Sequence, residues 1–227
     1  MTSRSGPRNH LLRALLEDTG DPVAGGVEMF RPAPEGSVLY GPGAPMTAAY
    51  FPERAVVALV FIDHDGRKIE IATVGNEGMV GLPLVLGATD QIGCAVVQIS
   101  GDMARIPAPL LARALDAHAR LRDVFLAYAH AFIADLIRTQ HCVRRHTVEQ
   151  RCARWLLATH DRVGRDVVPV KADWLNDALR VSRPGLTSVL RRWDGAGLIR
   201  YDRRRVTIVE RTALEGVACA CYAGSRT

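Results

Sequence analysis

The spacing of hydrophobic residues changes twice along the 227-residue chain, and the first stretch has the texture of a β domain. Between residues 25 and 107, short runs rich in Val, Ile and Ala are separated by Gly and Pro, as in closely spaced strands. Asp65-Gly66 lies between VVALVFID and KIEIATV, and an Asp-Gly pair between two such runs predicts a hairpin. We expect a jelly-roll-like antiparallel β-roll, preceded by a short helix over residues 9–17 with Asn9 as its N-cap.

The second stretch, residues 108–144, contains no Gly or Pro after Pro109 and predicts one long helix. Its apolar stripe, wider than a coiled-coil seam, includes Val124, Ile133 and Ile137 and the candidate dimer contacts Leu121, Phe125, Tyr128, Phe132 and Leu136. One edge of this stripe can pack on the β-roll, and the other can meet a second copy of the helix. A purely intrachain role is the alternative.

A third stretch begins at Thr147, which forms a capping box with Gln150 and so predicts a new helix. Val148, Cys152, Trp155 and Leu156 supply the expected buried face of this helix. It is expected to end near Gly164, where the glycine can close the last turn. The next pattern, KADWLNDALRV over residues 171–181, predicts a short helix that breaks at Val181-Ser182.

The run from Ser182 to Gly197 predicts a second short helix with two different faces. Ser182 is expected to cap it through its hydroxyl, Pro184 is tolerated in its first turn, and Gly195 and Gly197 end it. The buried stripe comprises Leu186, Val189, Leu190 and Trp193. The opposite face comprises Arg183, Pro184, Thr187, Ser188, Arg191 and Arg192.

Two short helices with a tight break, the second with a cationic outer face, match a helix-turn-helix. LIRYDRRRVTIVE follows, alternating on both sides of a turn at Asp202-Arg203-Arg204 as the two strands of a wing would. Arginines at such a tip are placed to contact phosphates. The candidate DNA-binding residues are Lys171, Ser182, Arg183, Thr187, Ser188, Arg191, Arg203, Arg204 and Arg205.

The charge is distributed unevenly and supports a polyanionic partner. Residues 141–211 hold sixteen Arg or Lys and eight Asp or Glu, whereas the whole chain has a net charge of only +5. Such asymmetry is expected when one domain meets nucleic acid. Because the chain shows neither an apolar run of membrane-spanning length nor a secretory signal, we expect a cytoplasmic protein with no membrane partner.

The five cysteines contain no CxxC pair and are expected to be reduced and structural. They are Cys94, Cys142, Cys152, Cys219 and Cys221. Cys219 and Cys221 stand two residues apart, which is poor spacing for a metal unless other ligands join them. No metal site is therefore expected.

The sequence resembles the Crp/Fnr family of bacterial transcription regulators over nearly its whole length. The resemblance is carried by YFPERAVVALVFIDHDGRKIEIATVGNEGMVGLP, HCVRRHTVEQRCARWLLATHDRVG, the helix-turn-helix with its wing, and the final CACY. It implies an α+β fold with a cyclic-nucleotide-binding-like sensor roll over residues 1–107, a long dimerisation helix over 108–145 and a winged helix-turn-helix domain over 146–227. It also implies a homodimer on a two-fold-related site in double-stranded DNA, with RNA polymerase as a further partner.

The expected effector pocket departs from the pattern of family members that bind cyclic AMP. Those members carry a Gly-Glu pair and, about ten residues later, an Arg-Ser pair. Here Gly81 is followed by Leu82, Gly93-Cys94 stands in place of Arg-Ser, and no cation occurs between Gly81 and Gln98. A buried cyclic phosphate would lack its charged partner. We expect no tight binding of cyclic AMP and assign the pocket to Gly81, Leu82, Cys94 and Ala95, with an unknown effector.

Other cofactors of the family also lack their ligands. The family's iron–sulfur sensors use N-terminal cysteines, and this chain has none before Cys94. Haem requires axial ligands, and no ligand pair stands out among His64, His118, His130, His141 and His146. No cofactor is therefore expected.

The recognition helix departs from the family as well. Arg183 matches the first arginine of the familiar pattern and can still fork onto a guanine. Pro184 replaces the glutamate and Ser188 the second arginine. The familiar half-site therefore does not carry over to this chain.

Two other functions are alternatives to a DNA-binding regulator. A small-molecule receptor that acts through protein contacts would have the same roll, and the basic wing favours DNA over it. A cupin-like enzyme would need several histidines and a carboxylate around a metal, but the roll offers His64 alone. We therefore expect no enzymatic activity.

Overall fold

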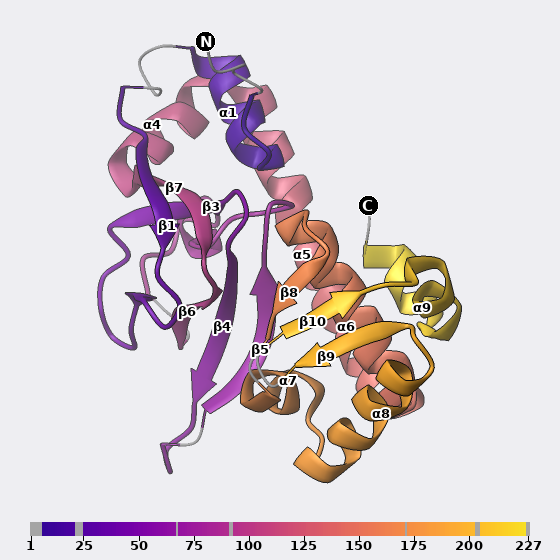
Figure 1. Cartoon of the computed structure of the whole chain (residues 1–227). Coiled ribbons are helices and arrows are strands. Elements are labelled where there is room, and N and C mark those ends of the chain that lie inside the picture. Colours follow the sequence, from indigo (N-terminus) through magenta and orange to yellow (C-terminus); the bar gives the residue numbers. More distant parts are fainter. Residues whose placement is uncertain are drawn as a thin grey trace. The chain divides into compact units, whose positions relative to one another are not determined.

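A computed structural model describes residues 6–20, 25–66, 68–90, 93–170, 172–202 and 205–225 (Figure 1). The chain forms two compact units, Met1–Phe132 and Ile133–Thr227. Among the described segments, none of the helices combines the length and the apolar character needed to cross a lipid bilayer.

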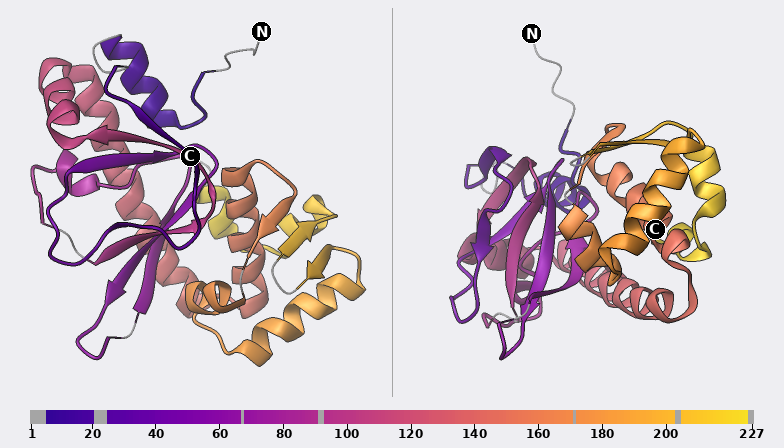
Figure 2. Two further views of the ribbon diagram at one scale, coloured as in Figure 1. Left: turned by 60° about the vertical axis from the view of Figure 1, so that its left-hand side comes forward. Right: turned by 60° about the horizontal axis from the view of Figure 1, so that its bottom comes forward.

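The first unit contains two antiparallel sheets, seen from two directions in Figure 2. One sheet has the order β1 (Glu28–Ala33), β7 (Gly101–Pro107), β3 (Ala48–Pro52). The other has the order β2 (Val38–Tyr40), β6 (Cys94–Ile99), β4 (Val56–Ile62), β5 (Lys68–Val74). Ala33 and Met103 of the first sheet share a buried cluster with Val57 and Val97 of the second, so a core lies between the sheets. The expected β-roll is confirmed.

The expected hairpin is present between β4 and β5. The two strands pair antiparallel from Val57 opposite Val74 to Ile62 opposite Lys68. Gly66 has φ +75° in the connecting turn, a left-handed conformation that favours glycine. The Asp-Gly pair therefore marks the turn correctly, because the turn requires a left-handed residue at Gly66.

Helix α1 (His10–Thr19) begins at Asn9, as the sequence predicts. The Leu12 N–H donates to Asn9 Oδ1 at 2.9 Å. Asn9 Nδ2 in turn donates to the carbonyls of Pro52 and Gly78. The fully buried Asn9 thus caps the helix and ties it to the roll, and its side-chain amide has partners for both its donor and its acceptor.

The single helix expected from residue 108 is in fact two helices. Helix α4 (Ala108–Ala117) ends at His118, whose backbone is extended, and α5 (Ala119–Arg145) starts directly after it. α4 buries Leu111, Ala114 and Leu115 in the core of the first unit. The apolar pattern continues through the break, because both helices have an inward face, and so it does not reveal the change of direction.

The second unit continues from the end of α5 with a helical domain and a small sheet. Its helices are α6 (Val148–Val163), α7 (Ala172–Leu179), α8 (Arg183–Gly195), α9 (Arg211–Val217) and the 3-10 helix η1 (Ala220–Ser225). The sheet has the order β8 (Val167–Pro169), β10 (Arg205–Ile208), β9 (Ile199–Asp202). The wing strands β9 and β10 pair as expected, and β8 adds a third strand that was not foreseen.

The start and end of α6 follow the local sequence. The Thr147 hydroxyl accepts from the Gln150 N–H, and the Gln150 side chain accepts from the Thr147 N–H, which completes the capping box. At the other end, Gly164 has φ +62° and closes the last turn. Cys152 and Leu156 are buried as predicted, whereas Val148 and Trp155 are only half-buried.

Candidate nucleic-acid interface

Helix α8 has one buried and one exposed face, as its sequence predicts. Leu186, Val189, Leu190 and Trp193 are buried. Arg183, Pro184, Ser188 and Arg191 are exposed, and Thr187 is half-buried. These last five residues line one open depression in the surface. The arrangement presents a polar and cationic helix face while the leucines hold the helix to its domain.

The start of α8 differs in one respect from the expectation. Ser182 occupies the N-cap position with an extended backbone, but no N–H within the described part of α8 donates to its hydroxyl. The Leu186 N–H donates instead to the Ser182 carbonyl at 3.2 Å, and Pro184 lies in the first turn. Ser182 is exposed, and its hydroxyl remains a candidate phosphate contact.

The turn between α7 and α8 depends on Arg180, which has φ +51°. The Val181 N–H donates to the Asn176 carbonyl at 3.1 Å, which closes the end of α7. A left-handed residue followed by the extended Ser182 reverses the chain within a few residues. This is the tight break of a helix-turn-helix.

A salt bridge holds α8 against α6. Glu149 accepts from the Arg192 guanidinium at 2.6 Å and from Trp193 Nε1 at 2.8 Å. The Arg192 hydrogen bond lowers the pKa of Glu149, burial opposes this, and the Trp193 hydrogen bond adds to it. The sequence places Arg192 on the outer face of α8, and in the structure its contact with Glu149 holds the helix against α6.

The wing places a further cation at the surface. Arg205 begins β10 and is exposed, and it pairs in register with Asp202 of β9. The Tyr201 N–H donates to Asp194 at 3.0 Å, which ties β9 to the end of α8. The other expected contacts, Lys171, Arg203 and Arg204, lie outside the described residues.

Comparison with known families identifies this part of the chain. Residues 150–217 match the family described as the Crp-like helix-turn-helix domain. This stretch is a Crp-like helix-turn-helix domain. No curated protein sequence matches the chain significantly.

Solved structures extend the likeness to the whole fold. FixK2 from Bradyrhizobium japonicum has a TM-score of 0.72 at 16% identity, over 86% of this chain and 98% of its own. TTHB099, a CRP-family transcriptional regulator from Thermus thermophilus, has a TM-score of 0.66 at 20% identity, over 87% and 97%. CLP, a c-di-GMP responsive regulator from Xanthomonas campestris, has 0.59 at 17% identity, over 87% and 97%. The resemblance to Crp/Fnr regulators is confirmed at the level of the fold.

The residues assigned to an effector pocket lie in packed surroundings. Ala95 is fully buried on β6, in the cluster between the sheets, and Cys94 beside it is also buried. Gly81 has φ +109° and approaches Ala49 and Met46, and the half-buried Leu82 opens the short helix α3 (Leu82–Val85).

Two more features of the roll concern the same segment. Burial and then the nearby Cys94 raise the pKa of Tyr40 to about 12. Gly93, which stands where cyclic AMP binders carry arginine, has φ +92°, and a Cβ built on it would collide with the carbonyl oxygen of Val60. The backbone therefore excludes a side chain at this position.

The residues expected at a dimer contact divide into two groups. Leu121 and Phe125 are fully buried in the core of the first unit, and Phe125 packs edge-to-face on Phe51 at 6.3 Å. They are therefore unavailable to a partner. Tyr128, Phe132 and Leu136 are half-buried.

The exposed apolar face of α5 carries other residues. Leu126, Ile133 and Ile137 are 42%, 51% and 67% exposed. Their spacing of seven and four residues places them on one side of the helix. These three residues are the exposed part of the apolar stripe of α5, whereas Leu121 and Phe125 are buried within the first unit.

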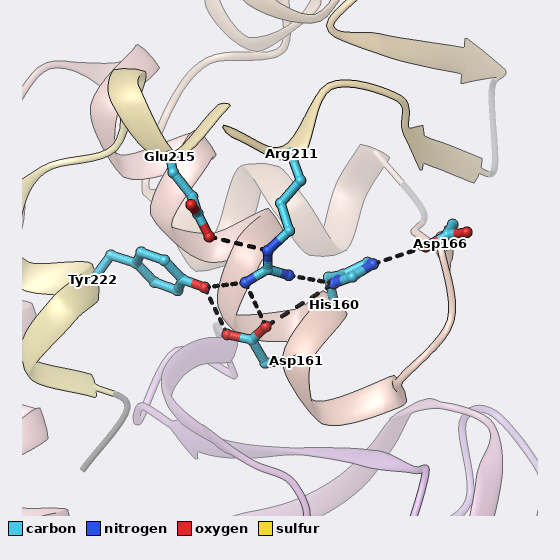
Figure 3. A network of polar contacts seen from close by, with 6 residues as sticks. All are labelled: His160, Asp161, Asp166, Arg211, Glu215 and Tyr222. Carbon is cyan, nitrogen blue, oxygen red and sulfur yellow. Dashed lines mark hydrogen bonds and ion pairs between the residues drawn. The ribbon is translucent and has the colours of Figure 1, made fainter. Parts of the chain in front are cut away.

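Arg211, at the start of α9, is the centre of a network of polar contacts near the C-terminal end of the Crp-like domain (Figure 3). The guanidinium contacts Glu215 at 3.0 Å, His160 Nδ1 at 2.6 Å, Asp161 at 2.8 Å and the Tyr222 hydroxyl at 2.6 Å. The Tyr222 hydroxyl also donates to Asp161 at 2.7 Å.

This Arg211 network orders the groups around it. Because the guanidinium only donates, His160 Nδ1 accepts, and Nε2 is left to donate to Asp166 at 3.2 Å. Burial lowers the pKa of Arg211, but the hydrogen bond to Asp161 and the charge interactions with Asp161, Tyr222 and Glu215 together raise it. The network joins α6 to residues some fifty positions later, so no local pattern reveals it.

The structure also brings four metal-ligating side chains together. Cys142, His146, Cys219 and Cys221 have ligand atoms that all lie within 4.8 Å of one another. The sequence reasoning missed this cluster because it lacked the partners of Cys219 and Cys221. The available signal was the Cys-x-x-x-His spacing of Cys142 and His146, because residues four apart are neighbours wherever the chain is helical.

Proposed function

We propose that this chain is a homodimeric, sequence-specific DNA-binding transcription regulator whose α8 enters the major groove. One observation carries the proposal. The buried stripe of α8 fixes the helix while Arg183, Ser188 and Arg191 face outward beside Thr187. A helix presented in this way is the reading element of helix-turn-helix proteins.

The exposed residues divide into base-reading and backbone-binding groups. Arg183 forks onto a guanine edge, and Thr187, Ser188 and Arg191 contact bases or nearby phosphates. Ser182 and Arg205, together with Lys171, Arg203 and Arg204, position the phosphate backbone. Arg205 supports the backbone-binding role, because it is a cation at the turn end of the wing hairpin and DNA phosphates are anionic.

The homodimer forms through the exposed face of α5. Leu126, Ile133 and Ile137 would be covered by the same residues of a second copy, as in a two-fold contact. Two recognition helices then read half-sites about one helical turn, roughly 34 Å, apart. Contact with RNA polymerase belongs to the same proposal.

The roll senses something other than cyclic AMP, or it has a structural role. Gly93 supports this view, because the close approach of the Val60 carbonyl leaves no room for the arginine that would pair with a cyclic phosphate. In this role the roll needs no catalytic residue and no cofactor.

The test is fluorescence anisotropy on DNA from upstream of the chain's own gene and on random DNA, across a salt series. Arg183→Ala should lose about 1–3 kcal/mol of preference for the specific site. Arg205→Ala should weaken binding to both DNAs equally. It should also reduce the slope of log affinity against log salt concentration by about one. Arg113→Ala, an exposed arginine of α4 in the first unit, is the matched control.

Two results would contradict the proposal. Equal losses of Arg183→Ala on specific and random DNA would remove α8 from base reading. If the wild-type protein binds DNA weakly and its affinity does not change with salt concentration, DNA is not its partner.

A further inference from the structure

The Cys/His cluster is built from two short segments that lie far apart in the sequence. Cys142 is in the last turns of α5, and His146 follows that helix, with its N–H donating to the Cys142 carbonyl at 3.0 Å. Cys219 lies between α9 and η1, and Cys221 lies in η1. All four belong to the second unit, so their arrangement is internal to one compact body.

The distances between these side chains match the edges of a metal-centred tetrahedron. Cys142 Sγ and Cys219 Sγ are 3.5 Å apart, and Cys221 Sγ is 3.8 Å from His146 Nδ1. With Zn–S near 2.3 Å and Zn–N near 2.0–2.1 Å, ideal edges are about 3.8 Å between sulfurs and about 3.6 Å between sulfur and nitrogen. The four donor atoms are thus nearly in place around a common centre.

The composition of the cluster also indicates which metal it would bind. Three thiolates and one imidazole form a donor set of structural zinc sites. Cys142 and Cys219 are 2% and 4% exposed, so the centre would be shielded from water on that side. Donor atoms within 4.8 Å of one another surround a single ion, whereas an iron–sulfur cluster holds its ligands further apart.

We propose that Cys142, His146, Cys219 and Cys221 bind one zinc ion that ties the C-terminal segment to the end of α5. Four protein ligands leave no open position, so the site is structural. Binding replaces the thiol protons by the cation and releases them to solvent. The centre reinforces the join that the Arg211 network makes between α6 and the same C-terminal segment.

The first test is metal content and cobalt spectroscopy of the reduced full-length protein. Purified with zinc supplied, it should carry about one zinc per chain. After chelation, Co²⁺ should give intense sulfur-to-cobalt charge-transfer absorption and tetrahedral d–d bands, and added Zn²⁺ should abolish both. Cys221→Ser and His146→Ala, both at half-buried positions, should lose most of the metal.

Cys94→Ala is the matched control, because it removes a buried thiol from the first unit and leaves the cluster intact. It should retain full zinc. A strong chelator should lower the urea midpoint of wild type and of Cys94→Ala, but not that of Cys221→Ser. Circular dichroism checks that each variant is folded.

Three outcomes would overturn the proposal. One is zinc far below one per chain together with an octahedral cobalt spectrum of the wild type, which decides the matter even if every variant unfolds. Another is a Cys142–Cys219 disulfide in non-reducing mass spectrometry of protein prepared with zinc and reductant. The third is equal metal loss in Cys94→Ala and Cys221→Ser.

Discussion

Replacing Arg211 by methionine should destabilise the second unit while leaving the first intact. Methionine keeps an apolar stem of similar length and removes the guanidinium. Four contacts are then lost, to Glu215, His160, Asp161 and Tyr222. The hydrogen bond from the Tyr222 hydroxyl to Asp161 remains, so Asp161 keeps one of its donors after the guanidinium is removed.

The magnitude follows from the charge and the exposure of these groups. A hydrogen bond to a charged group contributes about 1.5–3 kcal/mol when buried, whereas an exposed ion pair contributes about 0–1 kcal/mol. The side chains of Arg211 and Asp161 are each 34% exposed, which places the network between these limits. We expect a loss of about 2–3 kcal/mol in the free energy of unfolding.

Tryptophan fluorescence during urea unfolding is the assay, because the chain's three tryptophans, Trp155, Trp174 and Trp193, all lie in the second unit. Arg191→Met, at an exposed position of α8, is the matched control and should change stability by less than about 0.5 kcal/mol. The double variant Tyr222→Phe/Arg211→Met should lose less unfolding free energy than the sum of the losses of the two single variants. A loss below about 0.5 kcal/mol for Arg211→Met, or strict additivity, would refute the reasoning.

Three further predictions concern the other features. Because the Arg192 hydrogen bond holds the pKa of Glu149 below its usual 4.5, the stability from this contact is present above that value and lost as the pH falls through the lower folded pKa. Glu149→Gln should therefore melt below wild type at pH 7 and approach it as the pH falls below the folded pKa of Glu149; a constant gap in thermal melts would contradict this. Gly93→Arg should destabilise the roll without creating cyclic AMP binding in calorimetry, and micromolar binding would show that the Val60 carbonyl does not exclude the side chain. Ile133→Glu should produce a monomer in light scattering, whereas Ile69→Glu, at a 38% exposed position of β5, should not; a dimeric Ile133→Glu would remove this face of α5 from the interface.

Local signals in the sequence were enough to place most secondary structure. The Asp65-Gly66 pair marked the β4–β5 turn, and Asn9 and Thr147 marked helix starts, because each acts on neighbours within a few residues. The two faces of α8 also followed from spacing alone, since burial repeats with the helical period. The candidate DNA-reading face could therefore be named from the order of the residues.

Some features of the same helices could not be read in this way. The break at His118 is invisible in the apolar pattern, because α4 and α5 both keep an inward face. Leu121 and Ile133 belong to one stripe in the sequence, yet one is fully buried and the other 51% exposed. Only packing against the roll distinguishes them.

By itself, then, the sequence determined the order of roll, helices and wing and the cationic face of α8, since these depend on short-range periodicity, capping and turn chemistry. Only the tertiary structure decided which groups meet across long separations. Arg211 reaches Asp161 across 50 residues, and Cys219 reaches Cys142 across 77. Such pairs leave no periodic trace, because their distance in space depends on how α6, α9, η1 and the end of α5 fold together.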